Sequence, residues 1–287
     1  MKNITTTPDA TIGSIGQIGG RLGRAGSLEA RVTTSEEDIQ EAQRIRYKVF
    51  YEELSATPTP VARRARRDVD AFDPICDHLV ILDRDRLTRQ KRRPIVGTYR
   101  LLRQEVAEAH QGFYSASEFE ISDLVQRNRP LQFLELGRSC VLPGYRRKRT
   151  LELLWHAIWR YCLMHRIDVL FGCASLPGTD VDRFAVPLSF LHHTASAPPQ
   201  WYVRAVPSRR IEMNRIEPGK IDRRSALRLL PPLVRGYLNL GAYFGDGAVA
   251  DEQFKTIDVM TVLPVSRIRK GYITYFDPDA GRQKAQP

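Results

Sequence analysis

The chain has 287 residues and carries 44 lysines and arginines against 33 aspartates and glutamates, which gives a net charge of +11. Hydrophobic residues make up 42% of the chain and charged residues 27%, a globular composition that excludes a largely disordered protein. The four cysteines form no C-x-x-C pair and no apolar run has membrane-spanning length. We therefore expect a cytoplasmic protein without a disulfide framework, a metal site or a membrane span.

The two ends of the chain lack the bulky apolar residues of a core. Residues 1–27 include the stretch GSIGQIGGRLGRAGS, whose glycines predict a flexible leader. Residues 277–287 predict a flexible tail. No internal repeat divides the rest, so we expect a single domain over residues 28–276.

The first half of this domain shows strand and helix patterns in turn. A strand is expected at Leu28–Thr33, and a helix with an apolar face follows up to about Leu54. The arginine- and proline-rich stretch Thr57–Arg67 predicts a mobile basic loop. Two short apolar runs, Leu79–Leu82 and Ile95–Leu102, predict a hairpin with a long basic loop.

The second half predicts a strand, a helix and a further strand in succession. A central strand is expected at Leu131–Val141, an amphipathic helix over Leu151–Cys162 and a short buried strand at Val169–Cys173. The remaining expected elements are strands at Trp201–Val206 and Ile257–Leu263 and a helix over Ala226–Leu240 that restarts at Pro231-Pro232. This mixed order predicts an α/β or α+β fold with helices packed on a sheet.

Charged residues stand within, or at the ends of, apolar elements of the first half. Each of them could form an ordinary surface ion pair. Together they follow the order R-x3-F, D-x-x-D, R-L-L and E-x-x-R, at Arg46, Asp70, Asp73, Arg100, Glu135 and Arg138.

That order resembles the acyl-homoserine-lactone synthases and, more closely, the bacterial L-ornithine N-alpha-acyltransferases that make lyso-ornithine lipid. The closer resemblance rests on ELGRSCV followed by a Tyr-Arg turn and a Leu/Trp-rich helix, on LFGCAS at Leu170–Ser175, and on the late block PPLVRGYLNLGAYFGDGAVADEQFKTIDV. It covers the chain from Leu28 to Tyr275. It implies a GNAT-like fold: a twisted mixed β-sheet flanked by helices, with central strands that splay apart to hold the pantetheine arm of a thioester donor.

The resemblance also implies an activity. We expect an N-acyltransferase that moves a 3-hydroxyacyl group from acyl carrier protein to the alpha-amino group of L-ornithine. No resident cofactor is then needed, because 4'-phosphopantetheine arrives on the carrier protein. An acyl-homoserine-lactone synthase that uses S-adenosylmethionine is the first alternative, and a non-catalytic basic adaptor on a membrane or nucleic acid is the second.

The positive charge predicts acidic partners. Acyl carrier protein is one, and the anionic inner face of the cytoplasmic membrane, with the protein bound peripherally, is another. The arginine-rich stretches are not interleaved with aromatic residues as a base-stacking surface requires, so nucleic acid is not an expected partner.

Glu135 is the candidate proton acceptor for the attacking amine, with Arg138 as its catalytic neighbour. Residues three apart in an unbroken strand face opposite sides of the sheet, but a bulge at Gly137 would turn both toward one cleft. The alternative is that Glu135 and Arg138 pair structurally with Arg100 or Asp73.

Two further groups of residues are candidates for substrate binding. A basic turn before the long helix favours an anion and predicts the phosphopantetheine and carrier site at Tyr145, Arg146, Arg147, Lys148 and Arg149. Ornithine needs a cation for its carboxylate and an acid for its side-chain ammonium. Arg46 or Arg100 is expected to bind the carboxylate, and Asp70 or Asp73 the ammonium.

Overall fold

The computed structural model describes residues 20–86 and 94–268. The predicted tail at 277–287 and residues 1–19 of the predicted leader lie outside the described residues. Within the described part, the helices are too short or too polar to cross a bilayer.

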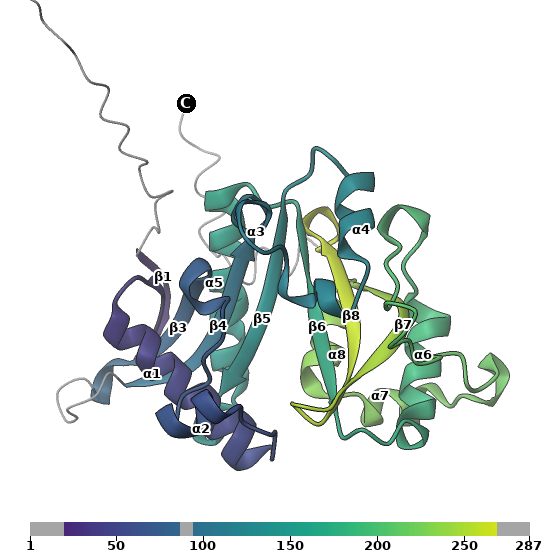
Figure 1. Cartoon of the computed structure of the whole chain (residues 1–287), viewed down its shortest axis with the longest axis horizontal. Helices are drawn as coiled ribbons and strands as arrows, with labels where there is room; N and C mark the ends of the chain where they lie inside the picture. The colour runs from purple at the N-terminus through teal and green to yellow at the C-terminus, as the bar shows by residue number, and fades with distance from the viewer. Residues whose placement is uncertain (1–19, 87–93, 269–287) are drawn as a thin grey trace, which may run out of the picture.

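One sheet of eight strands runs through the molecule in the order β1-β2-β3-β4-β5-β6-β8-β7 (Figure 1). Neighbouring strands are antiparallel except β5 and β6, which are parallel. The strands are β1 (Gly20–Ala25), β2 (Leu28–Thr33), β3 (Asp77–Asp83), β4 (Ile95–Arg103), β5 (Phe133–Val141), β6 (Val169–Pro177), β7 (Tyr243–Asp251) and β8 (Thr256–Pro264).

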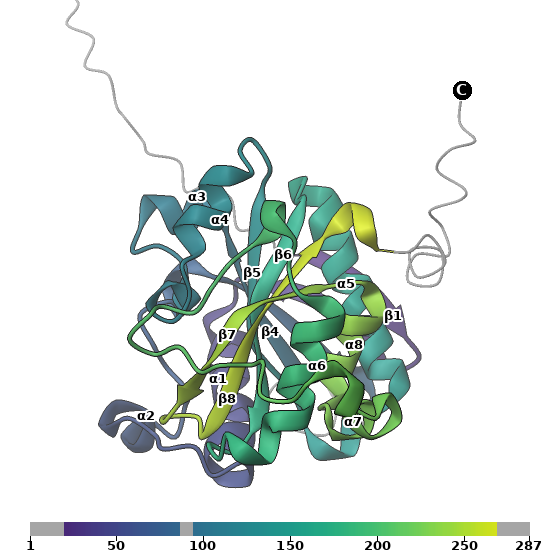
Figure 2. The same ribbon diagram turned by 90° about the vertical axis from the view of Figure 1, so that its right-hand side faces the viewer.

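The helices cover both faces of the sheet (Figure 2). Residues of α1, α3 and α4 pack on one face and those of α5, α6 and α8 on the other. The run DHLVILD of β3 is buried at every position because helices cover both of its sides. The helices are α1 (Glu36–Tyr47), α2 (Pro60–Ala65), α3 (Gln104–Ala109), α4 (Ile121–Arg127), α5 (Lys148–His165), α6 (Ala185–Ala195), α7 (Arg223–Leu229) and α8 (Pro232–Leu240).

The two parallel strands at the centre of the sheet diverge. β5 and β6 pair only from Phe133–Glu135 to Val169–Phe171, although both strands continue well beyond these residues. Gly172 lies where they part, and a Cβ there would come within 2.3 Å of the carbonyl oxygen of Leu136. Only glycine allows this approach. The predicted splay of the central strands is confirmed.

The predicted leader is wrong for residues 20–25, which form the edge strand β1. β1 pairs with β2 through a turn at Gly26, where φ is +62°. Gly23 is needed because helix α5 passes close: a Cβ there would lie 2.6 Å from the ring of His156. The glycines thus permit close packing, where composition alone suggested a flexible chain.

Two further element predictions are wrong and one strand was missed. Thr57–Arg67 is no loop, since Thr59 caps the helix α2 with its side chain. Trp201–Val206 forms isolated bridges instead of a strand, from Ala205 to Phe119 and from Arg204 to Asp246 of β7. β7 was missed because Gly245 and Gly247 interrupt its apolar pattern. The hairpin β3–β4, the strands β5, β6 and β8, and the helix restart at Pro232 are confirmed.

Candidate active site

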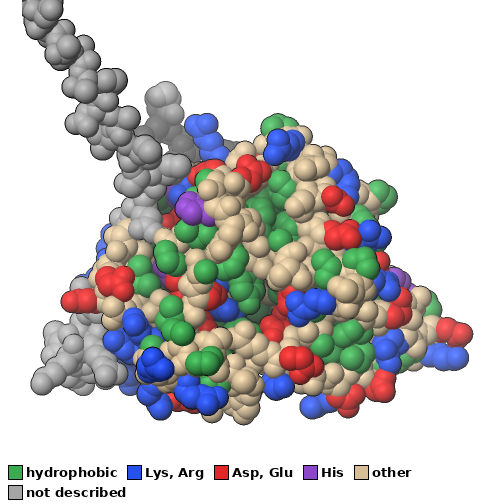
Figure 3. Space-filling model, in the orientation of Figure 1, with side chains coloured by type: hydrophobic (Ala, Val, Ile, Leu, Met, Phe, Trp, Pro, Cys, Tyr) green, Lys and Arg blue, Asp and Glu red, His purple; other side chains and the backbone are tan. Residues whose placement is uncertain are grey.

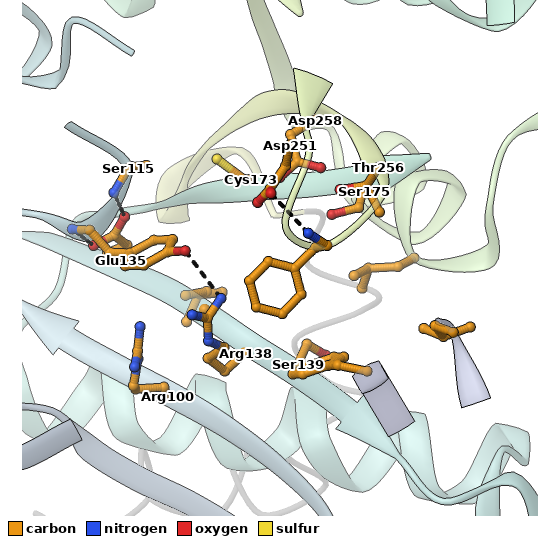
Figure 4. A pocket seen from close by; sticks show the side chains of 17 residues that line it. Arg100, Ser115, Glu135, Arg138, Ser139, Cys173, Ser175, Asp251, Thr256 and Asp258 are labelled. Atoms are coloured by element: carbon orange, nitrogen blue, oxygen red, sulfur yellow. Dashed lines mark hydrogen bonds between the residues drawn. The ribbon is translucent and has the colours of Figure 1, made fainter. Parts of the chain in front are cut away.

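A cavity of about 220 Å³ opens on the α1 side of the sheet where β5 and β6 diverge. Figure 3 shows the hollow near the middle of this face, and Figure 4 shows its lining side chains. Residues of β4, β5, β6, β8 and the turn between β7 and β8 form its walls. Its charged lining residues are Arg100, Glu135, Arg138, Asp251 and Asp258.

A β-bulge in β5 brings the two predicted catalytic residues to this cavity. Opposite Tyr99 of β4 stand two residues of β5, Arg138 and Ser139, where a regular ladder has one. Arg138 takes the left-handed conformation, with φ of +50°. Because the extra residue resets the alternation of side chains, Glu135 and Arg138 both line the cavity. The predicted bulge is confirmed, and its left-handed residue is Arg138, which follows Gly137.

Beside the cavity lies an ion-pair network of three arginines and three aspartates: Arg46, Arg100, Arg138, Asp68, Asp70 and Asp73. Asp70 accepts from Arg100 at 2.6 Å and from Arg138 at 3.0 Å. Burial opposes the ionisation of Asp70, but these two guanidinium groups outweigh it and hold its pKa below the usual range. Both carboxylate oxygens of Asp70 are therefore engaged, and the network is electrically neutral.

Arg46 lies beneath the cavity, outside its lining. It is fully buried and donates to Asp68 at 2.8 Å and to Asp73 at 2.7 Å. Tyr51 donates to the other oxygen of Asp68 at 2.8 Å. Burial alone would raise the pKa of Asp68, but the charges of Arg138 and Arg46 outweigh this effect and lower it. Asp73 is likewise buried, so neither Arg46 nor Asp73 borders the space that a substrate would fill.

Glu135 is buried and anchors a neighbouring loop. Its two oxygens accept from the backbone N–H groups of Tyr114 and Ser115 at 2.7 and 2.8 Å. Burial raises the pKa of Glu135, against the opposing effect of these donors. The carboxylate is thus a fixed acceptor whose affinity for a proton is increased.

Aromatic rings fix the guanidinium of Arg138. Its Cζ atom lies 4.8 Å from the ring centroid of Tyr114 and 4.4 Å from that of Phe254. Arg138 also donates to the Tyr114 hydroxyl at 3.2 Å. Sequence reasoning missed both rings, because they come from a loop before β5 and from the turn between β7 and β8.

The opposite wall of the cavity is acidic and was also missed. Burial raises the pKa of Asp258 to about 6 and that of its neighbour Glu118 to about 7. Cys173 contacts Glu118 at 3.6 Å, and burial raises the pKa of its thiol well above the usual value. The potential ligand atoms of Glu118, Cys173 and Asp258 lie within 4.8 Å of one another, so this group could also hold a metal ion.

The first part of the predicted donor site is held in place by hydrogen bonds. The Tyr145 hydroxyl donates to Asp83 at 2.6 Å. Arg146 donates through both terminal nitrogens to Glu53 and through Nε to the carbonyl oxygen of Val141 at 2.8 Å. These contacts fix the turn against the rest of the molecule.

The second part of that site is an exposed basic surface. Lys148 begins helix α5, and no side chain caps this helix end. Arg147 and Arg149 are exposed, and neither forms an ion pair within residues 20–86 and 94–268. Backbone donors at a helix start beside two such arginines favour a bound anion.

A mixed sheet with central strands that diverge around a polar cavity is the arrangement of the GNAT fold. The family model described as "Acetyltransferase (GNAT) domain" matches residues 45–156. Relatives named L-ornithine N(alpha)-acyltransferase match nearly the whole chain. The chain is 50% identical to the one from Rhizobium meliloti over 91% of this chain and 88% of that one. It is 37% identical to the one from Rhodobacter capsulatus, over 87% of this chain and 95% of that one.

The chain therefore belongs to the L-ornithine N(alpha)-acyltransferase family. This membership confirms the resemblance and favours it over the lactone-synthase and adaptor alternatives. Among solved structures, an N-acyl amino acid synthase from uncultured soil microbes is 12% identical, with a TM-score of 0.45 over 85% of this chain and 93% of that one. A CoA-dependent acyl-homoserine lactone synthase is 16% identical, with a TM-score of 0.46 over 86% of this chain and 83% of that one.

Proposed function

We propose that this enzyme transfers a 3-hydroxyacyl group from the phosphopantetheine thiol of acyl carrier protein to the alpha-amino group of L-ornithine, giving lyso-ornithine lipid. Family membership supports ornithine as the acceptor. The observation that carries the proposal is the cavity between β5 and β6, in which Glu135 and Arg138 face the same space.

The reaction forms a C–N bond and breaks the C–S bond of the thioester. The attacking alpha-amine must be neutral, and at neutral pH only about a tenth or less of such amines is so. Glu135 accepts the ammonium proton, directly or through a water molecule, and its raised pKa suits that task. The released pantetheine thiolate takes up a proton, so atoms and charges balance.

Arg100 and Arg138 are the groups that would bind the acceptor carboxylate. Both line the cavity and both are locked by contacts with Asp70 and Tyr114. Arg46, expected from the sequence to bind the carboxylate directly, instead orients Arg138 through Asp68, which contacts both arginines. Preorganised donors of this kind lose little entropy when the substrate binds.

The donor is proposed to dock at the start of helix α5. Arg147 and Arg149 would attract the acidic carrier protein, and the free N–H groups of α5 would bind the phosphate of its phosphopantetheine arm. No resident cofactor is part of this proposal. An anionic membrane would meet the same basic surface, and we treat membrane binding as an outcome to be measured.

The test is to incubate the purified protein with 3-hydroxyacyl carrier protein and to follow the release of free thiol. Thiol release that depends on ornithine is the expected result. Release with S-adenosylmethionine in place of ornithine would contradict the proposal. Adding the same acyl group on coenzyme A, and adding anionic vesicles, separates carrier-protein recognition from general attraction to anions.

A further inference from the structure

The cavity divides its charges between two walls. Arg100, Arg138 and Glu135 come from β4 and β5, whereas Asp258 comes from β8, across the divergence of β5 and β6 (Figure 4). Asp258 reaches the cavity because it pairs in register with Ser175 of β6, so that both side chains point to the same face. A ligand in the cavity would thus meet cationic groups at one side and an acid at the other.

Asp258 is buried without a full set of partners. Its residue is 7% exposed, and its Oδ1 atom accepts no hydrogen bond of normal geometry from any residue that the structure describes. The other acids nearby are engaged: Glu118 pairs with Arg209 at 3.1 Å, and Asp251 accepts two backbone N–H groups of its own turn. Asp258 forms no ion pair with a residue that the structure describes, and its polar neighbours Ser175 and Thr256 are neutral.

We propose that Asp258, supported by Glu118, binds the side-chain ammonium group of the acceptor amino acid. This assignment rests on the proposed function, because it takes a diamino acid as the acceptor. An ammonium group brings one positive charge and three donors, which match the unpaired charge and the unused oxygen of Asp258. A buried carboxylate gains most from such a partner, since leaving it unpaired carries its full desolvation cost.

The acids expected from the sequence are less suited to this task. Asp70 already accepts from two arginines, and Asp73 lies below the cavity with Arg46. With the carboxylate at Arg138 and the distal ammonium at Asp258, the alpha-amine of the acceptor falls between the two walls. That is where β5 and β6 part and where Glu135 faces the cavity.

A metal ion is the competing occupant of this wall, since Glu118, Cys173 and Asp258 lie close enough to share one. Glu118 already pairs with Arg209 at 3.1 Å, so a metal ion held by all three groups would compete with that arginine for the carboxylate. An ammonium group at Asp258 leaves the pair of Glu118 and Arg209 in place. The observations favour the ammonium, and the metal becomes an outcome of the test.

The experiment compares two acceptors, L-ornithine and L-2-aminopentanoate, which has the same carbon chain without the distal amine. Asp258→Asn should lower kcat/KM for ornithine by roughly 10²-fold or more, because a site built to pair a polar group loses most when that pairing fails. With 2-aminopentanoate, the variant and the unaltered protein should agree within about threefold. Glu217→Gln, an exposed acid on the surface, is the matched control and should change neither value.

Three outcomes would overturn the assignment. An equal loss on both acceptors would mean that Asp258 acts at the alpha-amine or only in the fold. A bound metal ion in the purified protein, with loss of activity on chelation, would assign the wall to the metal. If Asp258→Asn does not fold, Glu118→Gln is measured in the same way, and an unchanged preference for ornithine would contradict the proposal. Absence of transfer to ornithine by the unaltered protein would instead refute the proposed function itself.

Discussion

Glu135 combines two roles at the residue scale. It anchors the loop before β5 through two backbone N–H groups, and it presents a buried carboxylate to the cavity. Replacing this carboxylate with an amide breaks one of the two hydrogen bonds, because the NH2 group would face a backbone N–H, and this loss lowers stability. It also removes the proton acceptor, because an amide cannot take up the proton of the attacking ammonium, and this loss lowers kcat.

Glu135→Gln should therefore lower kcat by roughly 10²–10⁴-fold, the usual contribution of a general base. The fold should survive with a lower melting temperature, because glutamine keeps the size of the side chain but only one of its two acceptors. Rate and thermal melting are measured on the same preparation. Turnover close to that of the unaltered protein, in a folded variant, would remove Glu135 from the chemistry.

Asp258 should make stability depend on pH in the absence of substrate. Its pKa of about 6 in the fold, against 3.8 without it, corresponds to about 3 kcal/mol. Because the folded state holds the proton more tightly, this stability is present below pH 3.8 and is lost as the pH rises toward 6 and beyond.

Asparagine cannot ionise, so Asp258→Asn should melt at a higher temperature than the unaltered protein at about pH 8, with a smaller difference at about pH 5. Thermal melting at both pH values tests this. A difference that is the same at both would show that Asp258 pays no ionisation cost in the fold.

At the scale of single residues, sequence patterns predicted one wall of the site and missed the other. Glu135 and Arg138 could be found because their short motif lies on one strand with a glycine between them. Asp258 carries no local signal: only the pairing of β8 with β6 brings it to the cavity. Arg46 and Asp73 were expected to bind ornithine, but they lie beneath the lining of the cavity.

At the scale of elements, the β5 bulge and the start of α5 position the two substrates. The start of α5 is stabilised by Tyr145 and Arg146, whose partners belong to the protein itself. Arg147 and Arg149 remain for a partner molecule. Replacing Tyr145 or Arg146 should therefore affect the stability of the fold. Replacing Arg147 and Arg149 should affect the binding of the carrier protein.

Replacing Arg147 and Arg149 with alanine should raise the KM for the acyl carrier protein several-fold and weaken its dependence on salt, because screened charge contacts are lost. The KM for ornithine should hardly change. The matched control removes two exposed arginines at the start of α7, Arg223 and Arg224. An equal effect of both double variants would show that only net charge matters.

Predictability differed between elements for physical reasons. Helices α1, α5 and α8 and strands β3 to β6 carry apolar periodicity that the local sequence displays. β1 and β7 contain glycines that serve close packing, at Gly23 against His156 and at Gly245 against Val203. In a sequence such glycines predict a loop, because the neighbouring residue that requires a glycine is distant along the chain.

At the scale of the whole molecule, the divergence of β5 and β6 explains how distant segments make one site. The family block around Glu135 supplies the wall that carries Glu135 and Arg138, and the late block that ends in β8 supplies the wall that carries Asp258. The buried ion-pair network adds nothing to the net charge of +11, because its three arginines are matched by three aspartates. Among the described residues, Arg147 and Arg149 are exposed cations that an acidic donor can meet.

The central claim concerns which bond the enzyme makes, and one measurement tests it directly. The protein is given 3-hydroxyacyl carrier protein with an equimolar mixture of ornithine, lysine and S-adenosylmethionine, and the products are identified by mass spectrometry. The account predicts mainly the alpha-amide of ornithine with a free distal amine. Lysine should react more slowly by roughly 10–200-fold, the scale set by one misplaced methylene. A dominant acyl-homoserine lactone, or acylation at the distal amine, would contradict it.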